Sequence, residues 1–318
     1  MELDPIIAAY LADLRARGIP PAQDIPVEAA RGMYAMRTHL MNQREAPPEL
    51  AQVHDVFIPG PGGDIPARVY RPRVDEPLPT VLYVHGGGWV LCDIESHDPV
   101  CRRLAVLADA VIVSIGYRLA PEHPFPAAHE DTVAAYDWVR AQRSELGGST
   151  VWGVAGDSAG ANMTSAAIHL GRASIAPADA PAAHLCFYPA MDLTTRYPSM
   201  DRFGTGFGLE EPTLEYFLAQ YAAAADPADP RLSPLRFESH EGMPPTIVVT
   251  AGHDPFHDEG VAYVEALRAA GVTAHHQDAP GLIHGFVDLG PMVPAAAEAL
   301  TRAGTRFGEL LRGIPAMS

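Results

Sequence analysis

The regular alternation of two kinds of segment constrains the fold of this chain more than any other feature. Short runs rich in apolar and β-branched residues, as expected for strands, recur eight times, at residues 53–58, 66–71, 80–85, 110–117, 151–155, 183–188, 246–252 and 273–279. Segments with helical spacing lie between them, at residues 97–108, 129–143, 159–172, 257–270 and 295–312. Strands alternating with helices predict an α/β fold, with a mostly parallel eight-stranded sheet covered by helices on both faces.

The pattern inside each run indicates how the strand is covered. The first two runs alternate apolar and polar residues, which predicts a half-exposed antiparallel pair. The runs at 80–85, 110–117, 151–155 and 246–252 are nearly all apolar, as strands covered on both faces should be.

Two segments fall outside this alternation. Residues 1–45 combine short helical patterns with proline breaks, which indicates a helical arm before a main domain at residues 46–318. Residues 190–235 form a long insertion with one short helical pattern around "PTLEYFLAQYA". Because long connections in compact domains are usually lids or binding loops, we predict that the arm and the insertion form a cap over the carboxyl edge of the sheet.

Composition excludes several classes of function. The net charge of −17, from 39 acidic and 22 basic residues, disfavours binding to nucleic acid or to anionic lipid. No apolar segment is long enough to span a membrane, and the first residues lack the pattern of a secretion signal. The three cysteines (Cys92, Cys101 and Cys186) are odd in number and lack a C-x-x-C arrangement, which disfavours a disulfide scaffold and a structural zinc site. We therefore expect a cytoplasmic protein.

A candidate nucleophile lies in the sequence "GDSAG" at residues 156–160, directly after one predicted strand and before a predicted helix. In a sharp, strained turn of this kind a serine projects its hydroxyl away from the sheet, and the neighbours Gly156, Ala159 and Gly160 leave room for the crossing backbone. The pattern predicts that Ser158 is a nucleophile. An ordinary glycine-flanked turn between strand and helix is the alternative interpretation.

Successive glycines in "HGGGW", residues 85–89, follow the predicted strand at 80–85. Three glycines can turn the backbone so that amide groups face a cavity, as a developing oxyanion requires. A flexible turn and a phosphate-binding loop are the alternatives, but the second lacks both G-x-G-x-x-G and a terminal Lys-Ser or Lys-Thr.

A carboxylate and an imidazole follow the last two predicted strands. Asp254 comes after the strand at 246–252, and His284 lies in "GLIHGF", which we expect to be a mobile loop. Because ligands bind at the carboxyl ends of parallel strands, Ser158 and these two residues are expected to converge. Their order along the chain, Ser, Asp, His, is that of the α/β-hydrolases.

Other residues compete for these roles. Asp192 follows the predicted strand at 183–188 and is the chief alternative for the acid, while Asp258 suits the start of a helix and Asp157 a structural hydrogen bond. A metal site is conceivable at two groups, which are His253, His257 and Asp258, and the adjacent pair His275 and His276. We disfavour it because no known ligand motif is present and adjacent strand residues point to opposite faces.

The chain resembles the hormone-sensitive-lipase-type branch of the α/β-hydrolase esterases. The matching segments are "HGGGW", "YRLAPEHPFPAA" (117–128), "GDSAG", "HDPFHDEG" and "HGF". The family commonly has Leu and Arg where this chain has Phe256 and His257. The resemblance implies a cap, a serine hydrolase that needs no metal or cofactor, and a monomer or homodimer.

The resemblance also implies roles for single residues. Ser158, Asp254 and His284 would be the catalytic residues of a Ser-His-Asp acyl-enzyme mechanism. Following the family pattern, the oxyanion would be held by the amides of Gly87, Gly88 and Ala159. His85 and Trp89 would support the glycine loop.

These features favour a carboxylesterase that acts on short- to medium-chain esters. A non-catalytic small-molecule-binding relative is the alternative, as in gibberellin receptors, whose triad has lost its histidine; here His284 is present. A metal-dependent hydrolase is a third hypothesis. Several side chains could form the substrate pocket, although most of them are expected to be cap core: Tyr10, residues 33–36, Phe203, Phe207, Tyr216, Phe217 and Tyr221.

Overall fold

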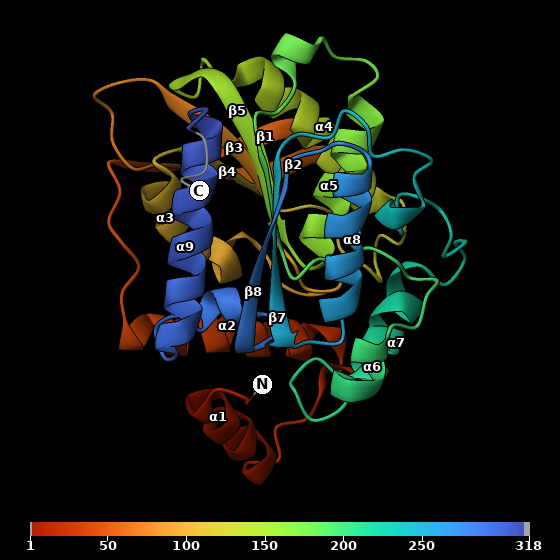
Figure 1. Cartoon of the computed structure of the whole chain (residues 1–318). Helices are drawn as coiled ribbons and strands as arrows, with labels where there is room; N and C mark the ends of the chain where they lie inside the picture. The colour runs from red at the N-terminus through yellow and green to blue at the C-terminus, as the bar shows by residue number, and fades with distance from the viewer. Residues whose placement is uncertain (1, 315–318) are drawn as a thin grey trace.

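A computed structural model describes residues 2–314, in which eight strands form one sheet in the order β1-β2-β4-β3-β5-β6-β7-β8 (Figure 1). The strands are β1 Gln52–Gly60, β2 Gly63–Arg71, β3 Leu78–Val84, β4 Val111–Ile115, β5 Gly148–Asp157, β6 His184–Phe187, β7 Thr246–His253 and β8 Ala274–Ile283. β2 pairs antiparallel with β1 and β4, and the other neighbours are parallel. The predicted α/β fold and the antiparallel first pair are confirmed.

Helices cover both faces of this sheet, as predicted. The α-helices are α1 Pro5–Ala16, α2 Val27–Arg44, α3 Ile94–Ala108, α4 Ala127–Gln142, α5 Ala159–Gly171, α6 Pro198–Phe203, α7 Glu211–Tyr221, α8 His257–Ala269 and α9 Pro294–Leu311. The short 3-10 helices within residues 2–314 are η1 Ala22–Asp24, η2 Pro177–Asp179, η3 Pro234–Arg236 and η4 Phe286–Asp288. Figure 1 shows α3 and α9 on one face and α4, α5 and α8 on the other. Within residues 2–314, no helix is long and apolar enough to cross a membrane.

The apolar character of the central strands follows from their burial on both faces. Along β3, Val81 and Tyr83 belong to the core beneath α3 and α9, whereas Leu82 and Val84 belong to the core beneath α4 and α5. All four side chains are completely buried. A strand of this kind has no polar face, which explains why its sequence does not alternate between apolar and polar residues.

The last strand, β8, extends beyond the predicted end at residue 279 and includes Pro280. β8 is at the edge of the sheet, where a proline without an amide hydrogen is tolerated. The register between β7 and β8 shifts between Ala251 and His253, and pairing continues to Ile283. A strand therefore leads directly to His284.

The N-terminal arm contains α1 and α2, and the insertion contains α6 and α7 rather than the single helix expected from the sequence. Sequence periodicity missed α6 because six residues make fewer than two turns. Figure 1 shows these four helices at the end of the sheet where the β7 arrow points. The hydroxyl of Thr213 in the insertion donates a hydrogen bond of 2.8 Å to the side-chain oxygen of Gln23 in the arm. The division into arm, insertion and main domain stays a prediction, and residues 1 and 315–318 lie outside the described residues.

We expect Leu104→Ala to lower the free energy of unfolding by about 2–5 kcal/mol, because this fully buried α3 side chain faces α9 and its loss leaves a cavity. Val106→Ala on the same helix is the control, because Val106 is 49% exposed and should change stability by less than about 0.5 kcal/mol. Urea unfolding followed by circular dichroism measures both. Equal effects of the two substitutions would contradict the packing described.

Candidate active site

Ser158 lies in a sharp turn between the end of β5 and the start of α5, with φ 52° and ψ −120°. A positive φ is strained for a serine and persists only where the surroundings enforce it. A Cβ atom on Gly160 would lie 2.0 Å from the carbonyl oxygen of Val84, and one on Gly156 would lie 2.7 Å from the carbonyl carbon of Gly160. Gly160 is therefore required by the close approach of the turn to β3, and Gly156 by the close approach of the two arms of the turn to each other, as the sequence pattern indicated.

Ser158, His284 and Asp254 form one line of hydrogen bonds. Nε2 of His284 is 2.9 Å from Oγ of Ser158, and Nδ1 of His284 is 2.8 Å from Oδ2 of Asp254. A carboxylate can only accept, so Nδ1 carries the proton and Nε2 is left to accept the serine proton. Asp254 is fully buried, and its Oδ1 accepts a 2.8 Å hydrogen bond from the amide of Phe256. This arrangement is that of a general base beside a hydroxyl nucleophile.

The surroundings of His284 differ from the expected mobile loop. The residue follows β8 directly, and only 10% of its side chain is exposed. The imidazole lies between the ring of Tyr188, with centroids 4.6 Å apart, and the ring of Phe256, with centroids 5.3 Å apart. Gly285 takes a φ of 75°, which turns the chain away after the histidine. Residues 281–283 of the expected loop therefore belong to β8, and His284 lies in the turn directly after it with aromatic rings packed on the imidazole; the mobility of this turn stays a prediction.

The glycine loop after β3 approaches Ser158, because a Cβ atom on Gly86 would lie 3.1 Å from Cβ of that serine. Gly87 has a φ of 110° and Gly88 a φ of 60°, and a Cβ atom on Gly87 would lie 2.2 Å from the carbonyl oxygen of Leu91. Within residues 2–314, neither glycine amide donates a hydrogen bond to a protein acceptor. Ala159 is the first residue of α5, a position whose amide has no acceptor in its own helix. These groups are available to bind an anionic oxygen.

Asp157 joins the glycine loop to the turn that carries Ser158. Its Oδ1 accepts hydrogen bonds from the hydroxyl of Tyr83 at 2.7 Å and the amide of Gly86 at 2.9 Å. Nε2 of His97 is 3.3 Å from the same oxygen. Burial opposes charge on both partners, but their mutual attraction outweighs it, so that the pKa of His97 is raised and the pKa of Asp157 is lowered. The structural role expected of Asp157 matches these contacts.

His85 and Trp89 pack behind the glycine loop. The ring of His85 stacks on Tyr117 with centroids 4.3 Å apart, and its Nδ1 donates to the carbonyl of Gly86 at 2.7 Å. Burial lowers the pKa of His85 to about 4, so the imidazole is neutral at pH 7. Trp89 stacks on Tyr221 of α7 with centroids 5.0 Å apart. These contacts suit the role expected of His85 and Trp89, which is to support the glycine loop.

The aromatic residues of the insertion divide into two groups. Tyr221 and Phe217 are buried, and a Cβ atom on Gly88 would lie 2.2 Å from the ring of Phe217. This first group packs against the glycine loop. Phe203 and Phe207 pack on the ring of His253, with centroids 5.2 and 5.3 Å away. This second group therefore packs on the residue that precedes Asp254 in the chain.

The alternative acids have other partners. Asp192 pairs with Arg236 at 3.1 Å and accepts from the amide of Thr194 at 2.9 Å. Asp258, the second residue of α8, accepts from the amide of Ser199 at 2.9 Å and so anchors α6. Neither carboxylate takes the place of Asp254 at the imidazole.

Sequence reasoning missed the buried Glu259. Its carboxyl group accepts from the amides of Met191 at 3.2 Å and Asp192 at 3.3 Å, and so ties the start of the insertion to α8. Burial raises the pKa of Glu259 well above its usual range. The only signal in the sequence was an acidic residue in the first turn of a predicted helix.

Two of the histidines considered for a metal site, His257 and His276, have protein partners. His257 contacts Asp258 at 2.8 Å and Asp278 at 3.6 Å. His276 pairs with the hydroxyl of Thr250 at 2.8 Å, on β7. In the described part of the chain, no group of three or more His, Cys, Asp or Glu side chains is arranged to hold a metal ion.

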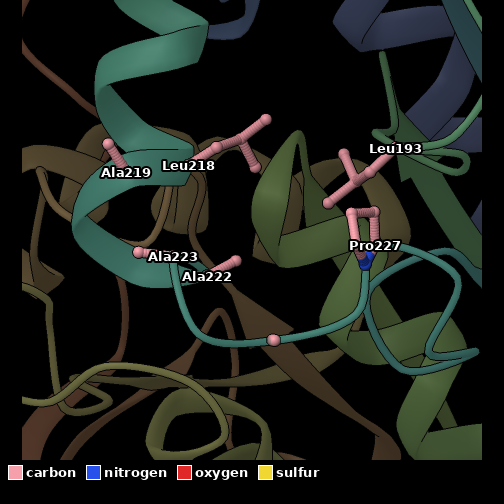
Figure 2. Close-up of a pocket in the computed structure, with 7 residues that line it drawn as sticks. Leu193, Leu218, Ala219, Ala222, Ala223 and Pro227 are labelled. Atoms are coloured by element: carbon pink, nitrogen blue, oxygen red, sulfur yellow. The ribbon is translucent and has the colours of Figure 1, made fainter.

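A hollow of about 390 Å³ lies beside the end of α7 and the segment that follows this helix (Figure 2). Its lining is apolar and consists of Leu193, Leu218, Ala219, Ala222, Ala223, Ala225 and Pro227. None of these residues belongs to the line of hydrogen bonds at Ser158. All of its lining residues belong to the insertion at residues 190–235.

Comparison with known proteins agrees with this geometry. Residues 81–288 match the model of a family described as having the alpha/beta hydrolase fold. The carboxylic ester hydrolase LipN of Mycobacterium tuberculosis is 41% identical over 297 residues, which cover 90% of this chain and 77% of LipN. The ethyl acetate hydrolase of Pseudomonas putida is 35% identical over 310 residues, which cover 94% and 96% of the two chains.

A solved structure extends the comparison to the whole fold. The hyperthermophilic esterase of the archaeon Pyrobaculum calidifontis superposes with a TM-score of 0.91 at 36% identity, over 99% of this chain and all of that one. The fold and the arrangement at Ser158 are those of an α/β-hydrolase. The chain belongs to the alpha/beta hydrolase family, in its hormone-sensitive-lipase-type branch of esterases.

Gly160→Ala is expected to destabilise the protein by about 1–3 kcal/mol and to lower turnover, because the new methyl group would meet the Val84 carbonyl at 2.0 Å. Gly32→Ala is the matched control, because nothing lies within 4 Å of that position in α2. Alanine favours a helix over glycine by about 1 kcal/mol, so the control should be neutral or stabilising. Thermal unfolding and ester hydrolysis measure both effects. A Gly160→Ala variant equal to wild type would contradict the close approach.

His97→Gln is expected to destabilise the protein more at pH 6 than at pH 9. A raised pKa in the folded state means that protonated His97 contributes stability below its unfolded pKa of about 6.5, and that this contribution fades as the pH rises through the raised value. Glutamine keeps a hydrogen-bond donor near Asp157 but carries no charge. Urea unfolding at both pH values measures the difference, and equal losses would show that the pair is uncharged.

Proposed function

We propose that this protein is a carboxylic ester hydrolase in which Ser158 is the nucleophile, His284 the general base and Asp254 the acid that orients it. The observation that carries the proposal is the hydrogen-bonded line from Ser158 through His284 to the buried carboxylate of Asp254, with bonds of 2.9 and 2.8 Å. Named relatives that cover most of the chain are carboxylic ester hydrolases, which supports the same reaction.

In the first half of the reaction, His284 takes the proton of Ser158 as the serine oxygen attacks the ester carbonyl. Asp254 holds the imidazole in the required tautomer and stabilises its positive charge. The amides of Gly87, Gly88 and Ala159 would bind the oxyanion of the tetrahedral intermediate. One donor of this kind contributes about 3–4 kcal/mol to catalysis in other hydrolases.

The second half of the reaction regenerates the serine. The imidazolium of His284 gives its proton to the leaving alcohol, and the acyl group stays on Ser158. Water then attacks the acyl-enzyme with the same base and the same oxyanion donors, and the carboxylic acid leaves. We infer that the ring packing around His284 keeps Nε2 within reach of two oxygens, which are Oγ of Ser158 and the oxygen of the leaving alcohol.

We infer that the acyl chain is short to medium and that the arm and insertion act as a cap that limits it. Phe217 fills the space over Gly88, and the arm contacts the insertion at Gln23 and Thr213. A buried aromatic cap leaves little room for a long chain. The relative from Pseudomonas putida is named for the hydrolysis of ethyl acetate, a small ester.

We also infer that the enzyme works in the cytoplasm as a monomer or homodimer. Its three cysteines are buried and free, which suits a reducing compartment. The inferred assembly rests on the resemblance to the family. A non-catalytic binding role is disfavoured because the imidazole and the hydroxyl lie within hydrogen-bond distance.

We expect wild-type protein to hydrolyse p-nitrophenyl esters with a maximum at short to medium acyl chains, and Ser158→Ala to lose at least about 10³-fold in kcat because the nucleophile is gone. The measurement is a chain-length series from acetate to palmitate, run on both proteins. Circular dichroism shows whether the variant is folded.

The same assay is combined with phosphonate labelling and with chelator treatment of the wild-type protein, and three results would contradict the proposal. Activity that survives in Ser158→Ala would reject the nucleophile. Wild-type protein that neither turns over p-nitrophenyl butyrate nor takes a phosphonate label would favour the binding role. Activity lost on treatment with a chelator would favour the metal-dependent hydrolase.

A further inference from the structure

The N-terminal arm contacts both ends of the segment that carries His284, here defined as residues 281–288. The amide of Asp4, which caps α1, donates a 2.9 Å hydrogen bond to the carbonyl oxygen of Gly281. At the other end, the guanidinium of Arg37 in α2 forms an ion pair with the carboxylate of Asp288. Two helices of the arm therefore hold a segment about 250 residues further along the chain, which places His284 between two anchors.

The second anchor is a charged pair in a restricted space. The side chains of Arg37 and Asp288 are 28% and 21% exposed, and the ring of Tyr34 lies 5.2 Å from the guanidinium carbon. A Cβ atom on Gly285 would lie 4.0 Å from Nη2 of Arg37. The guanidinium thus spans the turn from the residue after His284 to the end of η4.

The same helix reaches the glycine loop. Arg31 in α2 donates from Nε to the carbonyl oxygen of Val90 at 2.9 Å, directly after the sequence "HGGGW". It also donates from Nη2 to the carbonyl oxygen of Ala120 at 2.9 Å and pairs with Glu122 at 2.8 Å. Arg31 and Arg37 are six residues apart, which is about 9 Å along a helix. One rigid helix therefore contacts both the loop of the predicted oxyanion donors and the segment of the predicted base.

We propose that Arg37 is a positioning residue for His284, and that its ion pair with Asp288 holds residues 281–288 so that the imidazole stays within reach of Ser158. This inference rests on the proposed function. Arg37 touches neither Ser158 nor the reacting atoms in this proposal, and it acts only through Asp288 and the turn at Gly285.

The physical reason is the small tolerance of proton transfer. A base must lie within about 2.6–3.2 Å of the oxygen whose proton it takes, and a misplacement of about 1 Å can lower the rate about 100-fold. Removing Arg37 leaves the half-buried Asp288 carboxylate without its cation. We expect the unpaired carboxylate to move toward water, because water can stabilise the charge that Arg37 no longer neutralises. Asp288 is four residues from His284, so this movement would displace the imidazole.

A purely structural role predicts something different, and turnover per active site separates the two. If Arg37 only helps the protein to fold, its removal lowers the fraction of competent enzyme and the melting temperature. Each molecule that remains folded would still turn over at the wild-type rate. If Arg37 positions the base, each titrated active site is slower, whereas KM changes little because the substrate pocket is intact.

The experiment measures kcat and KM on p-nitrophenyl butyrate, with active sites titrated by a fluorophosphonate. Arg37→Met removes the charge and keeps most of the side-chain volume, and we expect kcat per titrated site to fall about 10- to 100-fold with KM within twofold. Arg37→Lys keeps a cation near Asp288 and should stay within about threefold of wild type. Arg17→Met is the matched control, because among residues 2–314 the exposed Arg17 guanidinium pairs only with Asp13, and the substitution should leave both constants unchanged.

Turnover per titrated site within twofold of wild type in Arg37→Met would overturn the inference, even if the melting temperature falls. Where Arg37→Met does not fold, Asp288→Asn tests the same ion pair from the other side, with the same expected fall and the same contradicting result. Failure of the proposed function is distinguishable, because it would leave the wild-type protein itself without hydrolysis or labelling.

Discussion

The carboxylate of Asp157 fixes the relation between the two turns on which the candidate site depends. It accepts from the amide of Gly86 after β3 while its own backbone leads into the turn at Ser158 after β5. The approach is so close that a Cβ atom on Gly86 would lie 2.5 Å from this carboxylate. The hydroxyl at residue 158 and the amides of the glycine loop consequently share one rigid frame. Catalysis of acyl transfer requires such preorganised donors.

This frame compensates for two unfavourable features. The positive φ of Ser158 costs on the order of 1–3 kcal/mol, and the surrounding structure retains it because α5 is buried and the Ser158 amide donates to the carbonyl of Phe187 at 2.9 Å. The buried charge of Asp157 is offset by His97 at 3.3 Å. A polar cluster beneath the site therefore stabilises a strained nucleophile turn inside an apolar sheet.

The sequence predicted what depends on local pattern and on the order of strands. Central strands such as β3 are covered on both faces, so their composition identifies them, and parallel pairing brings the residues after β5, β7 and β8 to one edge. Contacts between distant segments left no local signal. Arg37 and Asp288 are 251 residues apart, and the pairing of β8 past Pro280 depends on its edge position. The packing of Phe217 on Gly88 likewise arises only when the insertion folds over the glycine loop.

A crystal structure of the protein after reaction with a phosphonate ester would test the proposed active site directly. We predict phosphorus bonded to Oγ of Ser158, with the phosphoryl oxygen about 2.7–3.1 Å from the amide nitrogens of Gly87, Gly88 and Ala159. We also predict that Nε2 of His284 lies beside the position of the leaving group. A phosphonate attached to another residue, or a phosphoryl oxygen directed away from the glycine loop, would contradict the proposed active site.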